Sequence, residues 1–134
     1  MFLLKFLVIF CVFAQTVLTK PLNKEDVQIW NNLIAPYNGA CLIEANLSLK
    51  NIEAIISEQN VQETKEVGDY FKCLYLKLRM IKPDGEVDVD VLLTKAPYMT
   101  TQIAEKCKKA VGFESDLSKI SNRLAACIVK SLSE

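Results

Sequence analysis

The chain has 134 residues, of which 51% are hydrophobic, with 16 basic and 16 acidic side chains and no histidine. This length suits a single domain with one core. No basic stripe or cluster of lysine and arginine stands out, which argues against nucleic acid as a partner.

Residues 1–19 have the profile of a secretory signal peptide. One positive charge, Lys5, precedes an unbroken run of nine apolar residues that ends at Ala14. This run is far short of the roughly 20 residues that a membrane-spanning helix needs. A cut after Ala14 would leave a very short signal, so we expect cleavage after Thr19. A buried N-terminal helix is the alternative. We expect residues 20–134 to be secreted and extracellular, with no stable membrane insertion.

The first expected helix follows Asn23, which can cap a first turn that contains two acids. Pro36 should kink or end this helix, and Asn38-Gly39 predicts a break before Cys41. The helix has one apolar face, formed by Val27, Trp30, Leu33 and Ile34.

A second, shorter helix can be capped by Ser48 or Asn51. The polar stretch 57–66 reads as a loop that leads into the most apolar helix, at about 64–80. A strand over 74–80 is the rival interpretation, because apolar and polar residues alternate there. We prefer a helix, since leucine, lysine, methionine and arginine are good helix formers.

Pro83-Asp84-Gly85 predicts a firm turn. The alternating stretch 87–91 admits a strand, but Asp88 can instead cap a short helix that ends at Pro97. Thr100 or Thr101 opens the next helix, for which Gly112 is the expected C-terminal cap. The last helix follows Asp116. The chain is therefore expected to be all-α, with about six helices.

Four cysteines remain once the signal and its Cys11 are removed: Cys41, Cys73, Cys107 and Cys127. In a small exported chain they predict two disulfides, and the sequence alone permits three pairings. A zinc site is the rival interpretation. With no Cys-x-x-Cys pair and no histidine, we expect no metal and no cofactor.

The segments around three of these cysteines resemble a known family. Cys73 lies in Tyr-Phe-Lys-Cys-Leu-Tyr-Leu-Lys-Leu, twelve residues before the glycine of Pro-Asp-Gly-Glu-Val-Asp. Cys107 lies in Ala-Glu-Lys-Cys-Lys-Lys, and Cys127 lies in Ala-Ala-Cys-Ile-Val-Lys. In these motifs, and over residues 23–132, the chain resembles the insect odorant-binding proteins.

Members of that family usually carry six cysteines, and two of the six positions differ here. Asp69 stands at the second position and Ser118 at the fifth. These two cysteines bond together in the family, so their joint loss resembles the four-cysteine, or "minus-C", type. The resemblance implies the pairs Cys41–Cys73 and Cys107–Cys127.

The resemblance also implies a function. The chain would be a secreted carrier of small hydrophobic molecules, such as odorants or pheromones, held in an apolar cavity among the helices. A chemosensory receptor is a further partner that the resemblance allows, and the sequence leaves the oligomeric state open. The cavity candidates, each of which could also be ordinary core, are Trp30, Phe71, Leu74, Leu78, Leu92, Ile103, Phe113, Leu124 and Ile128. The candidates for a polar group that orients the ligand are Tyr37, Tyr70, Tyr75 and Tyr98.

Two absences predict how such a carrier behaves. Without histidine, the chain lacks the side chain that normally titrates between pH 5 and 8, so ligand affinity should depend weakly on pH. Without the third bridge, the pocket should be more compliant than that of a six-cysteine relative.

Three other possibilities come from the residues. Asn46-Leu47-Ser48 is an N-glycosylation sequon, which makes Asn46 a candidate site. The same scaffold could serve as a secreted interaction protein, for example a venom, salivary or reproductive component. An enzyme is not expected, because Ser–His and Cys–His pairs cannot form and the carboxylates of Asp88 and Asp90 read as ordinary solvated acids.

Overall fold

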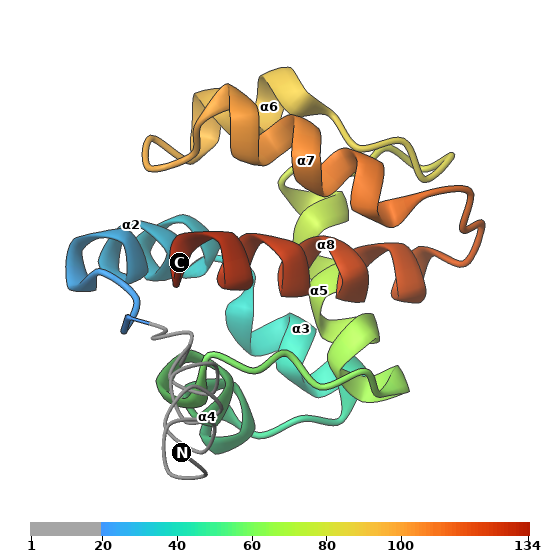
Figure 1. Cartoon of the computed structure of the whole chain (residues 1–134). Helices are drawn as coiled ribbons and strands as arrows, with labels where there is room; N and C mark the ends of the chain where they lie inside the picture. The colour runs from blue at the N-terminus through green and yellow to red at the C-terminus, as the bar shows by residue number, and fades with distance from the viewer. Residues whose placement is uncertain (1–19) are drawn as a thin grey trace, which may run out of the picture.

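The structure, a computed structural model, describes residues 20–134, and the expected signal peptide at 1–19 lies outside the described residues. This part of the chain is all-helical, which confirms the expected fold class (Figure 1). Its seven helices are α2 (Lys24–Ile34), α3 (Asn38–Ala45), α4 (Leu49–Glu58), α5 (Lys65–Lys77), α6 (Val89–Lys95), α7 (Thr101–Val111) and α8 (Leu117–Leu132).

Helix α5 runs through the middle of the molecule and crosses α8, against which it makes its most extensive contacts (Figure 1). Helix α3 packs on α5, while α7 packs on α8 and on α6. The largest fully buried side chains include Tyr70 and Leu74 of α5 and Ile120 and Leu124 of α8, so the core lies around this crossing. None of the helices in the described residues is long and apolar enough to cross a membrane.

The helix starts follow the expected caps. The side chain of Asn23 accepts a hydrogen bond from the backbone N–H of Glu25 at 2.8 Å, and that of Asp116 accepts one from Lys119 at 3.0 Å. Ser48, Asp88 and Thr100 cap α4, α6 and α7 in the same way. Each cap satisfies a backbone N–H that has no partner within its helix. The short helix after Asp88 is therefore confirmed.

The end of the first helix near Pro36 is confirmed, since α2 ends at Ile34, but the break expected at Asn38-Gly39 is misplaced. The turn comes earlier, at residues 35–37, and Asn38 begins a separate helix, α3, which contains Cys41 near its middle. A cap hydrogen bond is missing at this start, but the side chain of Asn38 accepts one from the hydroxyl of Tyr70 at 2.6 Å. Tertiary contacts with α5 therefore outweigh the weak helix propensity of the Asn-Gly pair.

The helix expected over 64–80 ends earlier, at Lys77. Arg79 has a φ of 61°, and such a positive value ends a right-handed α-helix. Ile81 then forms an isolated antiparallel bridge with Val87. The turn between them needs Gly85, whose φ is 92°. The alternation at 87–91 thus reflects this one bridge, followed directly by the cap of α6.

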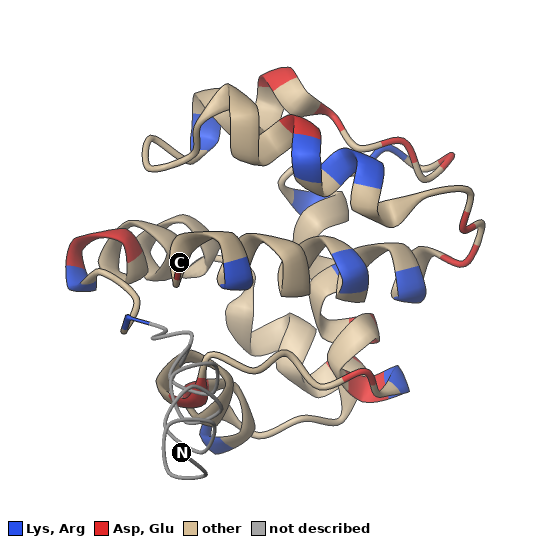
Figure 2. Ribbon diagram, in the orientation of Figure 1, with Lys and Arg blue, Asp and Glu red and all other residues tan. Residues whose placement is uncertain are grey.

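Charged side chains of both signs are spread over the surface of the described residues (Figure 2). Lysines gather on α7, where two of them have acidic neighbours. The Nζ of Lys108 lies 3.7 Å from a carboxylate oxygen of Glu86, and that of Lys106 lies 3.7 Å from one of Glu134. Exposed pairs of this kind contribute little to stability.

Candidate functional site

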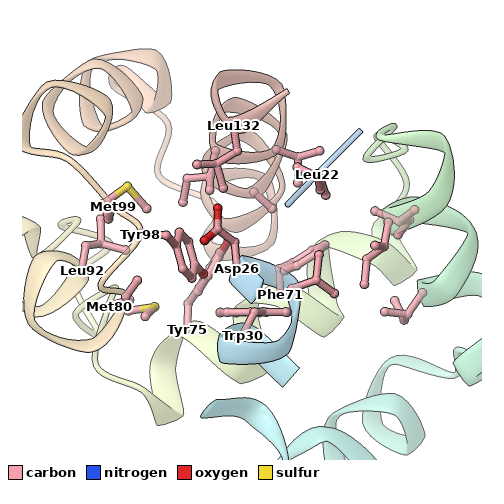
Figure 3. A pocket seen from close by; sticks show the side chains of 18 residues that line it. Leu22, Asp26, Trp30, Phe71, Tyr75, Met80, Leu92, Tyr98, Met99 and Leu132 are labelled. Carbon is pink, nitrogen blue, oxygen red and sulfur yellow. The ribbon is translucent and has the colours of Figure 1, made fainter. Parts of the chain in front are cut away.

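An apolar cavity of about 80 Å³ lies between α2, α4, α5, α8 and the segment around α6 (Figure 3). All of these elements are amphipathic or buried, and each turns apolar side chains toward the space they share. The lining residues are Leu22, Asp26, Val27, Trp30, Ile52, Ile55, Ile56, Phe71, Tyr75, Met80, Leu92, Ala96, Tyr98, Met99, Ala125, Ile128, Val129 and Leu132.

A group of aromatic rings forms part of the wall. The rings of Phe71 and Tyr75 stack with their centroids 5.7 Å apart, and the ring of Trp30 is tilted against Tyr75 at 6.1 Å. Phe71 and Tyr75 are buried on α5, whereas Trp30 is half-buried on α2. Such pairs present a rigid, apolar surface to whatever enters the cavity.

The cavity is small beside typical ligand pockets, which measure about 300–1,000 Å³. Two of its buried wall residues, Met80 and Met99, have unbranched and flexible side chains. A ligand of ordinary size therefore enters only if wall side chains change rotamer.

Four lining residues carry a nitrogen or oxygen atom on their side chains: Asp26, Trp30, Tyr75 and Tyr98. The carboxylate of Asp26 projects among the lining side chains, beside the ring of Tyr98 (Figure 3). Burial, with a further contribution from Asp26, raises the pKa of Tyr98 to about 12. Burial raises the pKa of Tyr75 further still. Both phenols therefore keep their protons at neutral pH and can donate hydrogen bonds.

The structure brings four of the nine cavity candidates to the cavity wall: Trp30, Phe71, Leu92 and Ile128. The buried Leu74, Leu78 and Leu124 belong to the core instead, and Ile103 is half-buried against it.

For Phe113 the expectation is wrong, because its side chain is fully exposed. The preceding Gly112, with a φ of 66°, ends α7 and turns the chain outward, so that Phe113 lies in the loop before α8.

Of the four tyrosine candidates, Tyr75 and Tyr98 line the cavity. Tyr70 donates its hydroxyl hydrogen to Asn38 instead, and Tyr37 is half-buried against the core.

Sequence reasoning missed Asp26, Met80 and Met99 as wall residues. Asp26 reads as a first-turn acid that suits the helix dipole. Its spacing of four from Trp30 would have placed both side chains on one side of α2.

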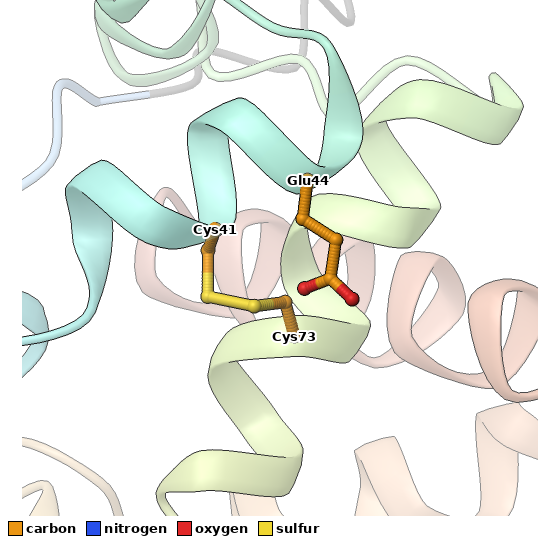
Figure 4. Close-up of side chains that lie close together, drawn as sticks. All are labelled: Cys41, Glu44 and Cys73. Carbon is orange, nitrogen blue, oxygen red and sulfur yellow. A yellow bond between two sulfur atoms is a disulfide. The ribbon is translucent and has the colours of Figure 1, made fainter.

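Within residues 20–134 there are two disulfides, Cys41–Cys73 between α3 and α5 and Cys107–Cys127 between α7 and α8. This confirms the pairing that the family resemblance implied. The carboxylate of Glu44 lies close to the Cys41–Cys73 bridge, and these three side chains have the proximity of a metal site (Figure 4). However, both sulfurs are bonded to each other, so neither can act as the thiolate ligand that a metal requires.

Asp69 and Ser118, the two positions at which the family resemblance implies a further disulfide in six-cysteine members, lie in contact. The hydroxyl of Ser118 on α8 donates a hydrogen bond to the carboxylate of Asp69 on α5. The Nζ of Lys65 lies 2.7 Å from the other oxygen of this carboxylate, and the Nζ of Lys72 lies 3.9 Å from the oxygen that Ser118 contacts. Partial burial opposes ionisation of Asp69, but the hydrogen bonds from Lys65 and Ser118 outweigh it and lower its pKa.

The backbones of α5 and α8 approach closely beside this contact. A Cβ at Gly68 would lie 2.7 Å from the carbonyl oxygen of Ser118, a distance that no side chain tolerates without movement of the backbone. Glycine at residue 68 therefore allows the close approach that brings Asp69 and Ser118 together.

The glycosylation candidate Asn46 is exposed at the C-terminal end of α3, with a φ of 56°. It borders a polar groove of about 370 Å³ between α4 and the start of α5. The groove is lined by amide and carboxylate side chains, among them Asn51, Asn60 and Glu58.

A comparison with protein-family models finds that the model of the PBP/GOBP family matches residues 24–131. No curated protein and no solved structure matches the chain. The matched residues contain α2 to α7 and nearly all of α8, and so include both disulfides and almost the whole wall of the cavity.

Proposed function

The chain belongs to the PBP/GOBP family, and on this premise we propose that it is a secreted carrier of small hydrophobic molecules, odorants or pheromones among them. The ligand occupies the cavity between α2, α4, α5 and α8. The family consists of binding proteins, and the proposal assigns no catalytic step to the chain.

The observation that carries this proposal is the composition of the cavity wall. Fifteen of its 18 described residues have wholly apolar side chains or the indole of Trp30, and they converge from five helices and the segments beside them. Transfer of an apolar molecule from water into such a site is favourable by about 25 cal/mol for each Å² of apolar surface buried. Apolar contact supplies most of the affinity, and the few polar groups orient the ligand.

Entry of a ligand requires the wall to yield. Met80 and Met99 can change rotamer at low cost, because their unbranched side chains have several accessible conformations. Leu22, Val129 and Leu132 are only half-buried, and we place the entrance of the cavity beside them. A ligand enters between these side chains and displaces the thioether groups further inside.

Trp30 provides a direct test, because it is the only tryptophan in the chain and lines the cavity. We expect its fluorescence to change on titration with neutral apolar volatiles and with N-phenylnaphthylamine, a neutral dye that becomes fluorescent in apolar sites. Volatiles that bind in the same cavity should displace the dye.

Ala125→Leu should weaken dye binding by about tenfold, because Ala125 is buried on α8 at the cavity wall and the added carbons fill the space. Ala110→Leu is the matched control, since the same change on an exposed residue of α7 leaves the cavity untouched. Dye binding that is absent in the wild-type protein, or equally strong in both variants, would contradict the proposal.

Secretion and modification belong to the same proposal. Expression of the full chain in insect cells should release a protein into the medium whose first residue is Lys20, as measured by mass spectrometry.

Exposure of Asn46 and the adjacent polar groove support its glycosylation. A mass loss on glycosidase treatment, absent in Asn46→Gln and retained in Ser48→Thr, is the expected result. An unmodified secreted protein would refute the glycosylation alone.

A further inference from the structure

One carboxylate stands alone in the apolar cavity. Of the 18 described residues that line it, Asp26 is the only charged one. Asp26 is half-buried in the first turn of α2 and forms no ion pair with any described residue. Its oxygens project into the space that a ligand would occupy (Figure 3). A charge in this position is costly to desolvate when a neutral ligand covers it.

Aromatic rings surround the same space. Trp30 lies one turn along α2 from Asp26. Tyr98 lies close enough to Asp26 for the carboxylate to raise the pKa of its phenol. Tyr75 packs against Trp30 deeper in the wall. The face of an aromatic ring attracts a cation, and indole and phenol rings do so most strongly. The wall therefore offers a carboxylate for a cation, with aromatic rings beside it for an apolar body.

We propose that the cavity selects ligands with a cationic primary amine on an apolar body, with the amine against Asp26 and the body among the rings of Trp30, Tyr75 and Phe71. The inference rests on the proposed carrier function and specifies its ligand class.

The chemistry of the two groups is complementary. An ammonium group has three hydrogen-bond donors and no acceptor, whereas an ionised carboxylate only accepts. Since Asp26 is only half-buried, the ammonium can keep part of its hydration while the apolar body is buried. Carboxylic acids, which would place a second negative charge beside Asp26, are disfavoured by the same geometry.

The experiment compares three molecules of nearly equal shape: phenethylamine, phenethyl alcohol and hydrocinnamic acid. Each competes with N-phenylnaphthylamine for the wild-type protein at neutral pH and low salt. We expect the amine to bind at least about fivefold more tightly than the alcohol, and the acid to bind most weakly. The preference for the amine should shrink as salt is raised, while the affinity for the alcohol stays constant.

Asp26→Asn should abolish the difference between amine and alcohol while leaving the affinity for the alcohol within about twofold. Glu25→Gln is the matched control, because it removes the same charge from the neighbouring exposed residue, outside the cavity. A wild-type protein that binds the alcohol as tightly as the amine overturns the inference. So does an amine preference that persists in Asp26→Asn or disappears equally in Glu25→Gln.

The failure of this inference can be told apart from failure of the carrier function. If the dye binds but the amine does not displace it preferentially, the carrier function stands and the ligand class is wrong. If the dye does not bind the wild-type protein, the carrier function itself fails. Should Asp26→Asn not fold, the comparison of the three molecules on the wild-type protein, with its salt dependence, still decides the question.

Discussion

Helix α5 is held to the rest of the molecule at two places by different chemistry. Near its middle, Cys73 is bonded to Cys41 of α3. One turn earlier, Asp69 is joined to Ser118 of α8 by a hydrogen bond, with lysines beside it. The family resemblance implies that a third disulfide of six-cysteine members would lie at this second place. The first connection is covalent, whereas the second is polar and its strength depends on the charge of Asp69.

The largest effect is expected from removal of the covalent connection. Cys41→Ser with Cys73→Ser opens a loop of 32 residues and should lower the free energy of unfolding by about 3–4 kcal/mol. Denaturation in urea, with m-values compared, measures this loss. Cys107→Ser with Cys127→Ser opens a shorter loop of 20 residues. This double change should lower the free energy of unfolding by slightly less. A loss below about 1 kcal/mol at both bridges would show that packing, not the bridges, holds the fold.

Converting the polar contact into a covalent one should have the next largest effect. Asp69→Cys with Ser118→Cys links residues 49 apart and should raise the free energy of unfolding by about 2 kcal/mol under oxidising conditions. Amide exchange in the first turns of α5 should slow in parallel. The reduced form of the same variant is the control. Unchanged exchange rates in the bridged protein would contradict the expected compliance of the natural chain.

Removal of the charge from the contact should have a smaller effect. Asp69→Asn should lower the free energy of unfolding by about 1–2 kcal/mol, because a charge-assisted hydrogen bond between half-buried groups is lost. Lys65 is highly exposed, so its ion pair contributes little to this figure. Glu66→Gln, at an exposed neighbour in the same turn, should change stability by less than about 0.5 kcal/mol. An equal loss of stability in both variants would mean that the effect comes from the helix dipole and not from the contact with Ser118.

The polar contact, unlike the disulfide, should fail in acid. The pKa of Asp69 is lower in the folded than in the unfolded chain, so its contribution is fully present above the unfolded pKa of about 3.9 and is lost as pH falls through the folded value. The stability difference between wild-type protein and Asp69→Asn should therefore be constant from pH 7 to 5 and shrink below about pH 4. Denaturation curves across this range measure it. A difference that persists at pH 2 would show that the carboxylate's charge is not its source.

The smallest effect concerns the cavity between pH 5 and 7. The chain has no histidine, and the contribution of Asp69 to stability does not change between pH 5 and 7. Neither connection of α5 therefore changes in strength over this interval. Affinity for a neutral ligand, measured by displacement of the dye, should change less than about threefold. A tenfold loss would mean that a group with a strongly shifted pKa controls the cavity.

Local signals predicted most of the secondary structure. Asn23, Ser48, Asp88, Thr100 and Asp116 each cap the helix that was expected after them, because a side-chain oxygen at such a position satisfies a backbone N–H whatever the rest of the fold does. The local rule failed at Asn38-Gly39, where contact with Tyr70 and the bond to Cys73 favour a helix that propensity does not.

The cavity was less accessible to sequence reasoning. Trp30, Phe71, Leu92 and Ile128 line it, but Leu74 and Leu124, equally apolar and equally well placed on their helices, are packed in the core. Periodicity identifies the buried face of a helix, not which part of that face borders an empty space. Asp26 was not predicted as a wall residue, because an acid in the first turn of a helix is normally explained by the helix dipole.

The sequence by itself determined most of the helices and the four bridging cysteines, because caps, periodicity and cysteine content are local properties of the chain, and its cysteine motifs resemble the family. Only the tertiary structure decided which side chains surround the cavity, that Asp69 and Ser118 touch, and that Asp26 faces an apolar space. These depend on the crossing of α5 with α8 and on the placement of α2 and α4 against them, and such contacts join residues far apart in the sequence.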